Sequence, residues 1–212
     1  KRMTVKGRVL RLAFASITLI SWDIPNANYI NFNAPDLGRK IEQALARFAG
    51  AESDLRMLSI HTQDGSGHNR SEQGAFLALK RIGLRFINNY GGDIVFGHGP
   101  HTHGGVRVVP RRNGRHGVMF TSLGNFIHDG LSNNPDNYIG RVVYDFAAGM
   151  KVKQVQALPY RNNPMAFYTQ TALRGNRRTQ LEERINANFD WRVGRFRDHS
   201  NTEKVLFFAD FD

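Results

Sequence analysis

Between residues 9 and 98, short apolar segments alternate with amphipathic ones, and this alternation constrains the fold more than any other feature. The apolar segments predict buried strands over residues 9–15, 55–60 and 94–96. Helical spacing of apolar residues predicts helices over residues 35–50 and 71–90. Strands that alternate with helices are typical of an α/β fold with parallel strands, and we expect that class here.

The sequence changes character after residue 105. It predicts strands in antiparallel style, separated by Arg-Asn-Gly and Ala-Gly turns, over residues 106–109, 117–121, 138–146 and 151–158. Residues 160–178 are expected to be irregular and polar, and the Arg-rich stretches 111–115 and 174–178 to be surface turns. A helix over residues 180–189 and a strand over residues 205–208 complete the prediction.

The composition excludes several classes of protein. With 41% hydrophobic residues the chain can bury a core, and without cysteine it has no disulfide, thiolate metal site or cysteine nucleophile. The most apolar run, Leu12–Ile20, has nine residues, whereas a membrane-spanning helix needs about 20. The net charge is +11, and Arg supplies 22 of the 29 basic residues. This excess favours a polyanionic partner, such as an anionic polymer or an anionic surface, although codon composition and solubility explain the charge equally well. A nucleic acid is not expected, because no basic run carries interleaved aromatic residues.

The densest chemical feature is the loop Gly97–Gly105. It holds His98, His101 and His103, three of the eight histidines, and it directly follows the buried strand at residues 94–96. Imidazole is the commonest metal ligand in proteins, and a glycine-rich loop lets rings converge. Loop histidines satisfied by water or backbone are the alternative interpretation, but the clustering at a strand end favours a metal site.

Two further segments end predicted strands with polar residues. His61 follows the strand at residues 55–60 and so matches the position of His98, since ligands gather at the carboxyl ends of parallel strands. Asp64, His68 and Glu72 lie nearby in sequence, but no pattern indicates where their side chains point. The second segment is Thr121–Phe126, for which two interpretations are open. Either Asn125 or the unpaired backbone amides of the segment face the same site as the histidines, or the segment is a tight turn. His128 and Asp129 follow it as candidates for supporting groups.

The order of these segments resembles a known family. Leu58-Ser59-Ile60-His61, then Asp93 to His101, then Ser122-Leu123-Gly124-Asn125-Phe126 is similar to the poly-gamma-glutamate capsule-synthesis (CapA-type) proteins of the calcineurin-like metallophosphoesterase superfamily. The resemblance covers about residues 5–160. It implies a layered α/β/β/α sandwich with a two-metal site at the strand ends. Residues 1–160 would then be the C-terminal portion of such a domain, and residues 161–212 an extension packed on it.

The resemblance also assigns residues. It implies His61, His98 and His101 as ligands of divalent Mn, Zn or Fe ions, and Asn125 as a residue that lines the site. His103 has no counterpart in the family and is a candidate ligand from the histidine cluster only. The sequence departs from the family pattern in two places. Gly99 stands where the family often has another histidine, and Thr62-Gln63 follows His61 where the family has Trp-Gly. The early Gly-Asp, Asn-x-Glu and Asn-His motifs are absent, so we expect an N-terminal fragment or second chain to complete the fold.

The resemblance implies a function in capsule or envelope polymer biosynthesis, with location in the cell envelope or outside the cell. A cytoplasmic location is the alternative. The expected activity is that of a metal-dependent hydrolase or transferase, provided that the missing ligands are supplied. His98 or a neighbour would hold metal or protonate a leaving group. A non-catalytic module that binds a polyanion on the same fold is one alternative. A simple zinc-binding protein that uses His61 with the three loop histidines is another.

Overall fold

The computed structural model describes residues 1–5, 7–20, 29–31, 33–62, 72–101, 103–111, 113–124, 136–163, 169–172, 175–187, 197–198 and 207–210. Over these residues the chain divides into two compact units, Lys1–Pro100 and His101–Asp212. The domain boundary expected between residues 160 and 161 falls within a strand, Lys151–Asn163, and it stays a prediction.

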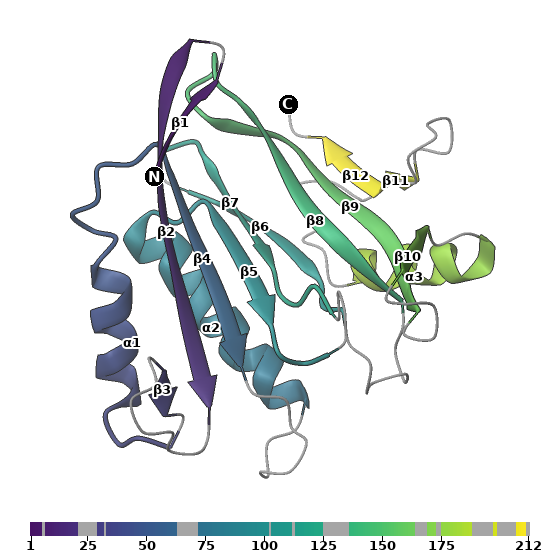
Figure 1. Ribbon diagram of the computed structural model, residues 1–212, viewed down its shortest axis with the longest axis horizontal. Coiled ribbons are helices and arrows are strands. Elements are labelled where there is room, and N and C mark those ends of the chain that lie inside the picture. The colour runs from purple at the N-terminus through teal and green to yellow at the C-terminus, as the bar shows by residue number, and fades with distance from the viewer. Residues whose placement is uncertain are drawn as a thin grey trace. The chain divides into compact units, whose positions relative to one another are not determined.

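The first unit is built around a sheet whose central strands are parallel (Figure 1). Its strands are β1 (Arg2–Val5), β2 (Arg8–Ile20), β3 (Ile30–Asn31), β4 (Leu55–Thr62) and β5 (Ile94–His98). They lie in the order β1-β2-β4-β5, and β3 also pairs with β2. The pairs β2–β4 and β4–β5 are parallel, as the alternating sequence predicts, whereas β1 folds back on β2 as an antiparallel hairpin. Strand β1 was not predicted from the sequence.

Two helices cover one face of this sheet, and the core lies beneath them. They are α1 (Leu37–Ala46) and α2 (Glu72–Tyr90). Both were predicted, and the range predicted for α1 is a few residues longer than the helix itself. Toward the carboxyl ends of the strands, alternate side chains are fully buried on this face, among them Leu19, Leu58 and Ile60. Phe48, just after α1, packs against Phe86 of α2, with the two ring centroids 4.7 Å apart.

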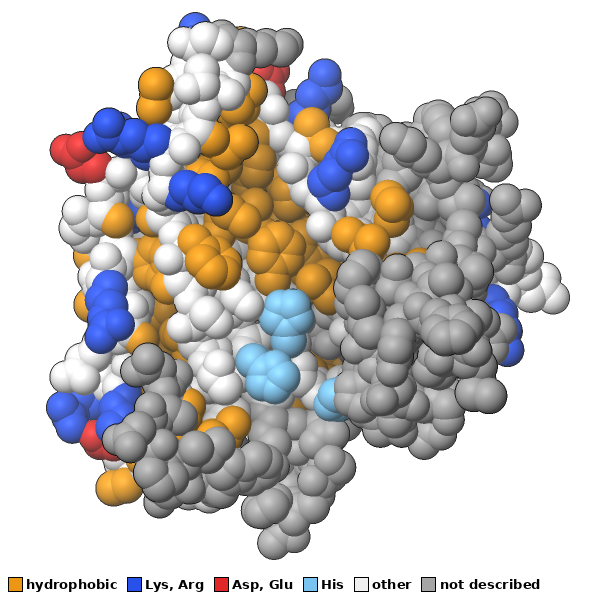
Figure 2. All heavy atoms as spheres, in the orientation of Figure 1, with side chains coloured by type: hydrophobic (Ala, Val, Ile, Leu, Met, Phe, Trp, Pro, Cys, Tyr) orange, Lys and Arg blue, Asp and Glu red, His pale blue; other side chains and the backbone are white. Residues whose placement is uncertain are grey.

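The opposite face of the sheet carries exposed apolar side chains. Phe14 of β2 is 61% exposed, and its register partner Met57 of β4 is half-buried. Figure 2 shows hydrophobic side chains gathered over β2, β4 and β5, with histidine side chains at the end of that patch. Within the described part of the first unit, helices pack on the other face only.

Side-chain contacts align β4 and β5 at the start of their pairing. Asp93, just before β5, is 2% exposed and accepts a hydrogen bond of 2.8 Å from the backbone N–H of Arg56. The Arg56 guanidinium in turn donates to the carbonyl oxygen of Tyr90, at 2.7 Å, where α2 ends. A buried carboxylate bonded in this way favours one register, and register decides which residues meet at the far end of the strands.

The second unit is antiparallel, as predicted. β6 (Val106–Pro110) and β7 (His116–Phe120) form a hairpin, and the Arg-rich stretch at residues 111–115 is its turn. A five-stranded sheet contains β8 (Asp136–Asp145), β9 (Lys151–Asn163), β10 (Thr169–Ala172), β11 (Arg197–Asp198) and β12 (Phe207–Asp210). All its pairs are antiparallel.

The prediction of irregular structure over residues 160–178 is wrong in part. β9 continues to Asn163, β10 occupies Thr169–Ala172, and α3 (Gly175–Ala187) begins five residues before the predicted helix start. The turn expected at residues 174–178 is therefore the first part of α3 from Gly175 onward. Polar strands and a polar helix lack the apolar periodicity on which the sequence argument depends.

The fold class is α/β, with a largely parallel central sheet in the first unit and three helices in the described part of the chain. None of those helices combines the length and the apolar character that crossing a bilayer requires.

Candidate functional site

His61 and His98 are direct neighbours on the sheet. They are register partners in the parallel pair β4–β5, at the carboxyl end of each strand, so their Cα atoms lie about 5 Å apart. Paired residues of neighbouring strands project to the same face. That face is the one that carries Phe14 and Met57. The prediction that these two histidines occupy matching positions is confirmed.

The backbone around the pair is closely packed. The Thr62 hydroxyl donates a hydrogen bond of 3.4 Å to the carbonyl oxygen of His98, and the Thr62 side chain is fully buried. Gly99 follows with φ of 121°, and a Cβ atom on it would lie 1.6 Å from the carbonyl oxygen of Thr62. Only glycine fits there, because both the dihedral angle and the space exclude a side chain. A histidine side chain would not fit at position 99 for the same two reasons.

The surroundings of the pair shift the pKa of His98. Burial, and then the charge of His61, lowers the pKa of His98 below its ordinary value of 6.5. His61 itself is exposed, whereas His98 is half-buried. At neutral pH, His98 is therefore the uncharged imidazole, which is the form that accepts a proton or binds a metal ion.

Thr18 extends this row of polar residues onto β2. It is the register partner of His61, so Thr18, His61 and His98 lie in one line across three parallel strands. Thr18 was not predicted as a site residue, although the rule that selects His61 and His98 applies to it. The first strand was expected to end at Ala15, whereas β2 runs to Ile20, and Thr18 was not recognised as a strand-end residue.

The other predicted ligands, His101 and His103, belong to the second unit. His101 has φ of 56°, a left-handed conformation that is uncommon for a residue with a side chain. His103 forms an isolated β-bridge with Leu123, and its ring centroid lies 6.5 Å from that of Tyr138. The Tyr138 hydroxyl donates a 3.2 Å hydrogen bond to the carbonyl oxygen of Gly104.

Two sequence segments singled out above therefore meet within the second unit. The Gly104 N–H donates to the Ser122 carbonyl at 2.8 Å, next to the bridge between His103 and Leu123. Gly124 has φ of 73°, and a Cβ atom on it would lie 1.7 Å from Oδ1 of the buried Asn137. This left-handed conformation at Gly124 is compatible with a tight turn, but the turn interpretation of Thr121–Phe126 stays a prediction. Asn125, His128 and Asp129 lie outside the described residues.

The donors partly fit a transition-metal ion. His61 and His98 offer two imidazoles from adjacent strands, and histidine suits Zn, Mn and Fe. A catalytic zinc site has three protein ligands as a rule. Over the residues that the structure describes, no group of three or more His, Cys, Asp or Glu side chains can hold a metal ion. Asp64 and His68 are outside those residues, and nothing is described of the Glu72 side chain.

Comparison with known proteins adds no assignment. Neither the models of known protein families nor the curated proteins contain a match to this chain.

Proposed function

We propose that this chain is a metal-dependent hydrolase or transferase of the CapA type, with the metallophosphoesterase sandwich fold, that acts on an anionic envelope polymer such as poly-γ-glutamate. The observation that carries the proposal is the in-register pair His61–His98 at the carboxyl ends of β4 and β5. Strand ends of α/β sheets are where ligands bind in proteins of this class.

His61 and His98 act in this proposal as metal ligands. The lowered pKa of His98 supports that role over the role of general acid, because a mostly deprotonated imidazole has no proton to donate at neutral pH. When bound, a divalent transition-metal ion polarises the scissile group and lowers the pKa of water. By the resemblance alone, His101 is a further ligand and Asn125 lines the site.

The open face of the sheet supports access by a large substrate. The exposed side chain of His61 leaves the end of β4 reachable from solvent, and the exposed ring of Phe14 lies on the same face of the sheet. The net charge of +11 attracts a polyanion over a distance of about one Debye length. On the face in Figure 2, Lys and Arg side chains are scattered and do not form one continuous patch. The net charge therefore supports general attraction of an anionic polymer, and it does not indicate a specific binding groove.

The proposal is tested by hydrolysis of a generic phosphodiester, bis-p-nitrophenyl phosphate, and of poly-γ-glutamate, with Mn²⁺ or Zn²⁺ added after chelation. We expect activity that depends on the metal and falls at least about 100-fold in His98→Ala. His116→Gln, which replaces a half-buried histidine of β7, is the matched control and should keep activity. Activity that survives chelation and the loss of His98 would contradict the proposal.

A second candidate function is a non-catalytic module that binds a polyanion. The excess of 29 basic over 18 acidic residues favours it, together with the lack of a three-ligand group in the described part of the chain. The discriminating measurement is poly-γ-glutamate binding by the chelated protein and by His61→Ala/His98→Ala. Binding that is unchanged by both treatments and weakens with added salt, without hydrolysis, supports the binding module.

A further inference from the structure

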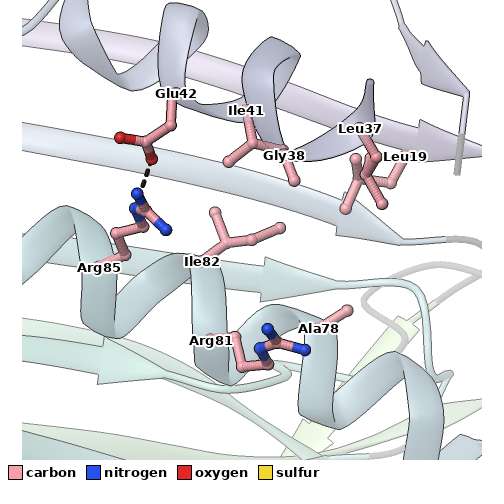
Figure 3. Close-up of a pocket in the computed structure, with 9 residues that line it drawn as sticks. All are labelled: Leu19, Leu37, Gly38, Ile41, Glu42, Ala78, Arg81, Ile82 and Arg85. Carbon is pink, nitrogen blue, oxygen red and sulfur yellow. Dashed lines mark ion pairs between the residues drawn. The ribbon is translucent and has the colours of Figure 1, made fainter. Parts of the chain in front are cut away.

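A pocket of about 340 Å³ lies between α1 and α2, on the face of the sheet opposite His61 and His98 (Figure 3). Its apolar lining comes from β2, α1 and α2, and its polar lining from both helices. The lining residues are Leu19, Leu37, Gly38, Ile41, Glu42, Ala78, Arg81, Ile82 and Arg85. Pockets that bind small molecules have volumes of about 300–1,000 Å³ and combine apolar walls with a few polar groups, and this one meets both conditions.

The absence of a side chain on Gly38 helps to keep the pocket open. Gly38 lies in the first turn of α1, and a Cβ atom on it would have no neighbour within 4 Å. No left-handed dihedral angle requires glycine there, and glycine within a helix costs about 1 kcal/mol relative to alanine. Gly38 therefore lines the pocket beside Leu37 and Ile41 without filling it.

The charges around the pocket are unequal. Arg85 forms an ion pair with Glu42, and the Tyr90 hydroxyl donates a hydrogen bond of 2.6 Å to the same carboxylate. In Figure 3 the dashed line marks the pair between Glu42 and Arg85. Arg81 lies one helical turn before Arg85 and is exposed. Among the residues that the structure describes, no carboxylate lies within ion-pair distance of Arg81, which leaves one surplus positive charge.

We propose that this pocket binds a small amphipathic monoanion, with a carboxylate head paired with Arg81 and a hydrocarbon body against Leu19, Ile41 and Ile82. The apolar walls select the hydrocarbon, and the guanidinium of Arg81 provides two N–H donors in the geometry of a carboxylate. Glu42 is already bonded to Arg85 and Tyr90 and does not neutralise Arg81. This site is separate from the proposed metal site and does not depend on it.

The test uses octanoate as the probe and the whole chain, with binding measured by calorimetry and by amide chemical shifts in NMR. We expect saturable binding with shifts in α1 and α2. Arg81→Gln should weaken it about tenfold or more, because a charge-assisted hydrogen bond is lost. Lys80→Gln is the matched control, since it removes the same charge from the adjacent residue, which does not line the pocket.

Two further variants separate the pocket from other apolar surfaces. Gly38→Leu fills the pocket and should abolish binding, while Phe14→Ser alters the exposed face of the sheet and should leave binding unchanged. Binding that is lost in Phe14→Ser and kept in Gly38→Leu would overturn the proposal. Equal affinity for octanol and octanoate would overturn the role of Arg81. Arg81 is exposed, so Arg81→Gln remains informative even if Gly38→Leu fails to fold.

Discussion

His61 and His98 are register partners at the carboxyl ends of two adjacent parallel strands, and they face the side of the sheet that α1 and α2 leave open. The pairing depends on contacts at both ends of the strands. Asp93 bonds to the backbone of Arg56 where the pairing of β4 and β5 begins, and Thr62 bonds to the carbonyl of His98 where it ends.

The first prediction concerns the protonation of His98. Because burial and the charge of His61 both lower its pKa, His61→Gln should raise the pKa of His98 part of the way toward 6.5. NMR titration of the imidazole Cε1–H signals of the metal-free protein measures this directly. The same titration curve in both proteins would show that the two rings do not interact.

The lowered pKa of His98 also predicts a pH dependence of stability. The folded state binds the proton less readily than the unfolded state, so the contribution of this group is complete above the unfolded value near 6.5. It is lost as the pH falls through the lowered value of the folded state. Urea unfolding of the metal-free protein between pH 7.5 and pH 5 should show a loss of stability that is smaller in His98→Gln. An equal loss in both proteins would assign the effect to other groups.

Position 99 should tolerate only glycine. Gly99→Ala places a Cβ atom against the carbonyl oxygen of Thr62 and forces alanine into a left-handed dihedral angle. We expect a loss of at least about 2 kcal/mol in the free energy of unfolding. Gly50→Ala is the matched control, because a Cβ atom there meets nothing within 4 Å and should cost little. The measurement is chemical denaturation of both variants, and equal stabilities would contradict the close approach.

The two faces of the first unit's sheet should respond differently to truncation. Phe86→Ala removes a fully buried ring from the helix layer and should cost about 3–5 kcal/mol. Phe14→Ser changes a ring that is 61% exposed and should cost about 1 kcal/mol or less. Thermal or urea unfolding compares the variants. A large cost for Phe14→Ser would mean that its face is covered in the folded protein.

The segment that carries His103 should depend on Tyr138. Tyr138→Phe removes the hydrogen bond to the carbonyl of Gly104 from a buried position, and we expect a loss of about 1 kcal/mol. Amide hydrogen exchange of the second unit should then increase at Gly104 and Thr121, whose N–H groups donate to the carbonyl oxygens of Ser122 and Gly105. Unchanged exchange at Gly104 would show that this hydrogen bond does not stabilise the segment.

Alternating apolar segments predicted the parallel strands and the matching positions of His61 and His98, because the carboxyl ends of parallel strands share one edge of a sheet. Strand β1 was missed because Arg2, Met3 and Thr4 are exposed and leave no apolar period. The close approach of Gly99 to Thr62 and the contact of His103 with Tyr138 join residues far apart in sequence, and no local pattern encodes either. The metal site, the family and the activity stay predictions.

The most direct test of the proposed function is the metal content of the protein after loading with Zn²⁺ or Mn²⁺ and removal of free ions. We expect bound metal in the unaltered protein and in His116→Gln, and its loss in His61→Ala and in His98→Ala, with folding confirmed by circular dichroism. Metal retained at the same stoichiometry in His61→Ala/His98→Ala, or no metal bound by the unaltered protein, would contradict it.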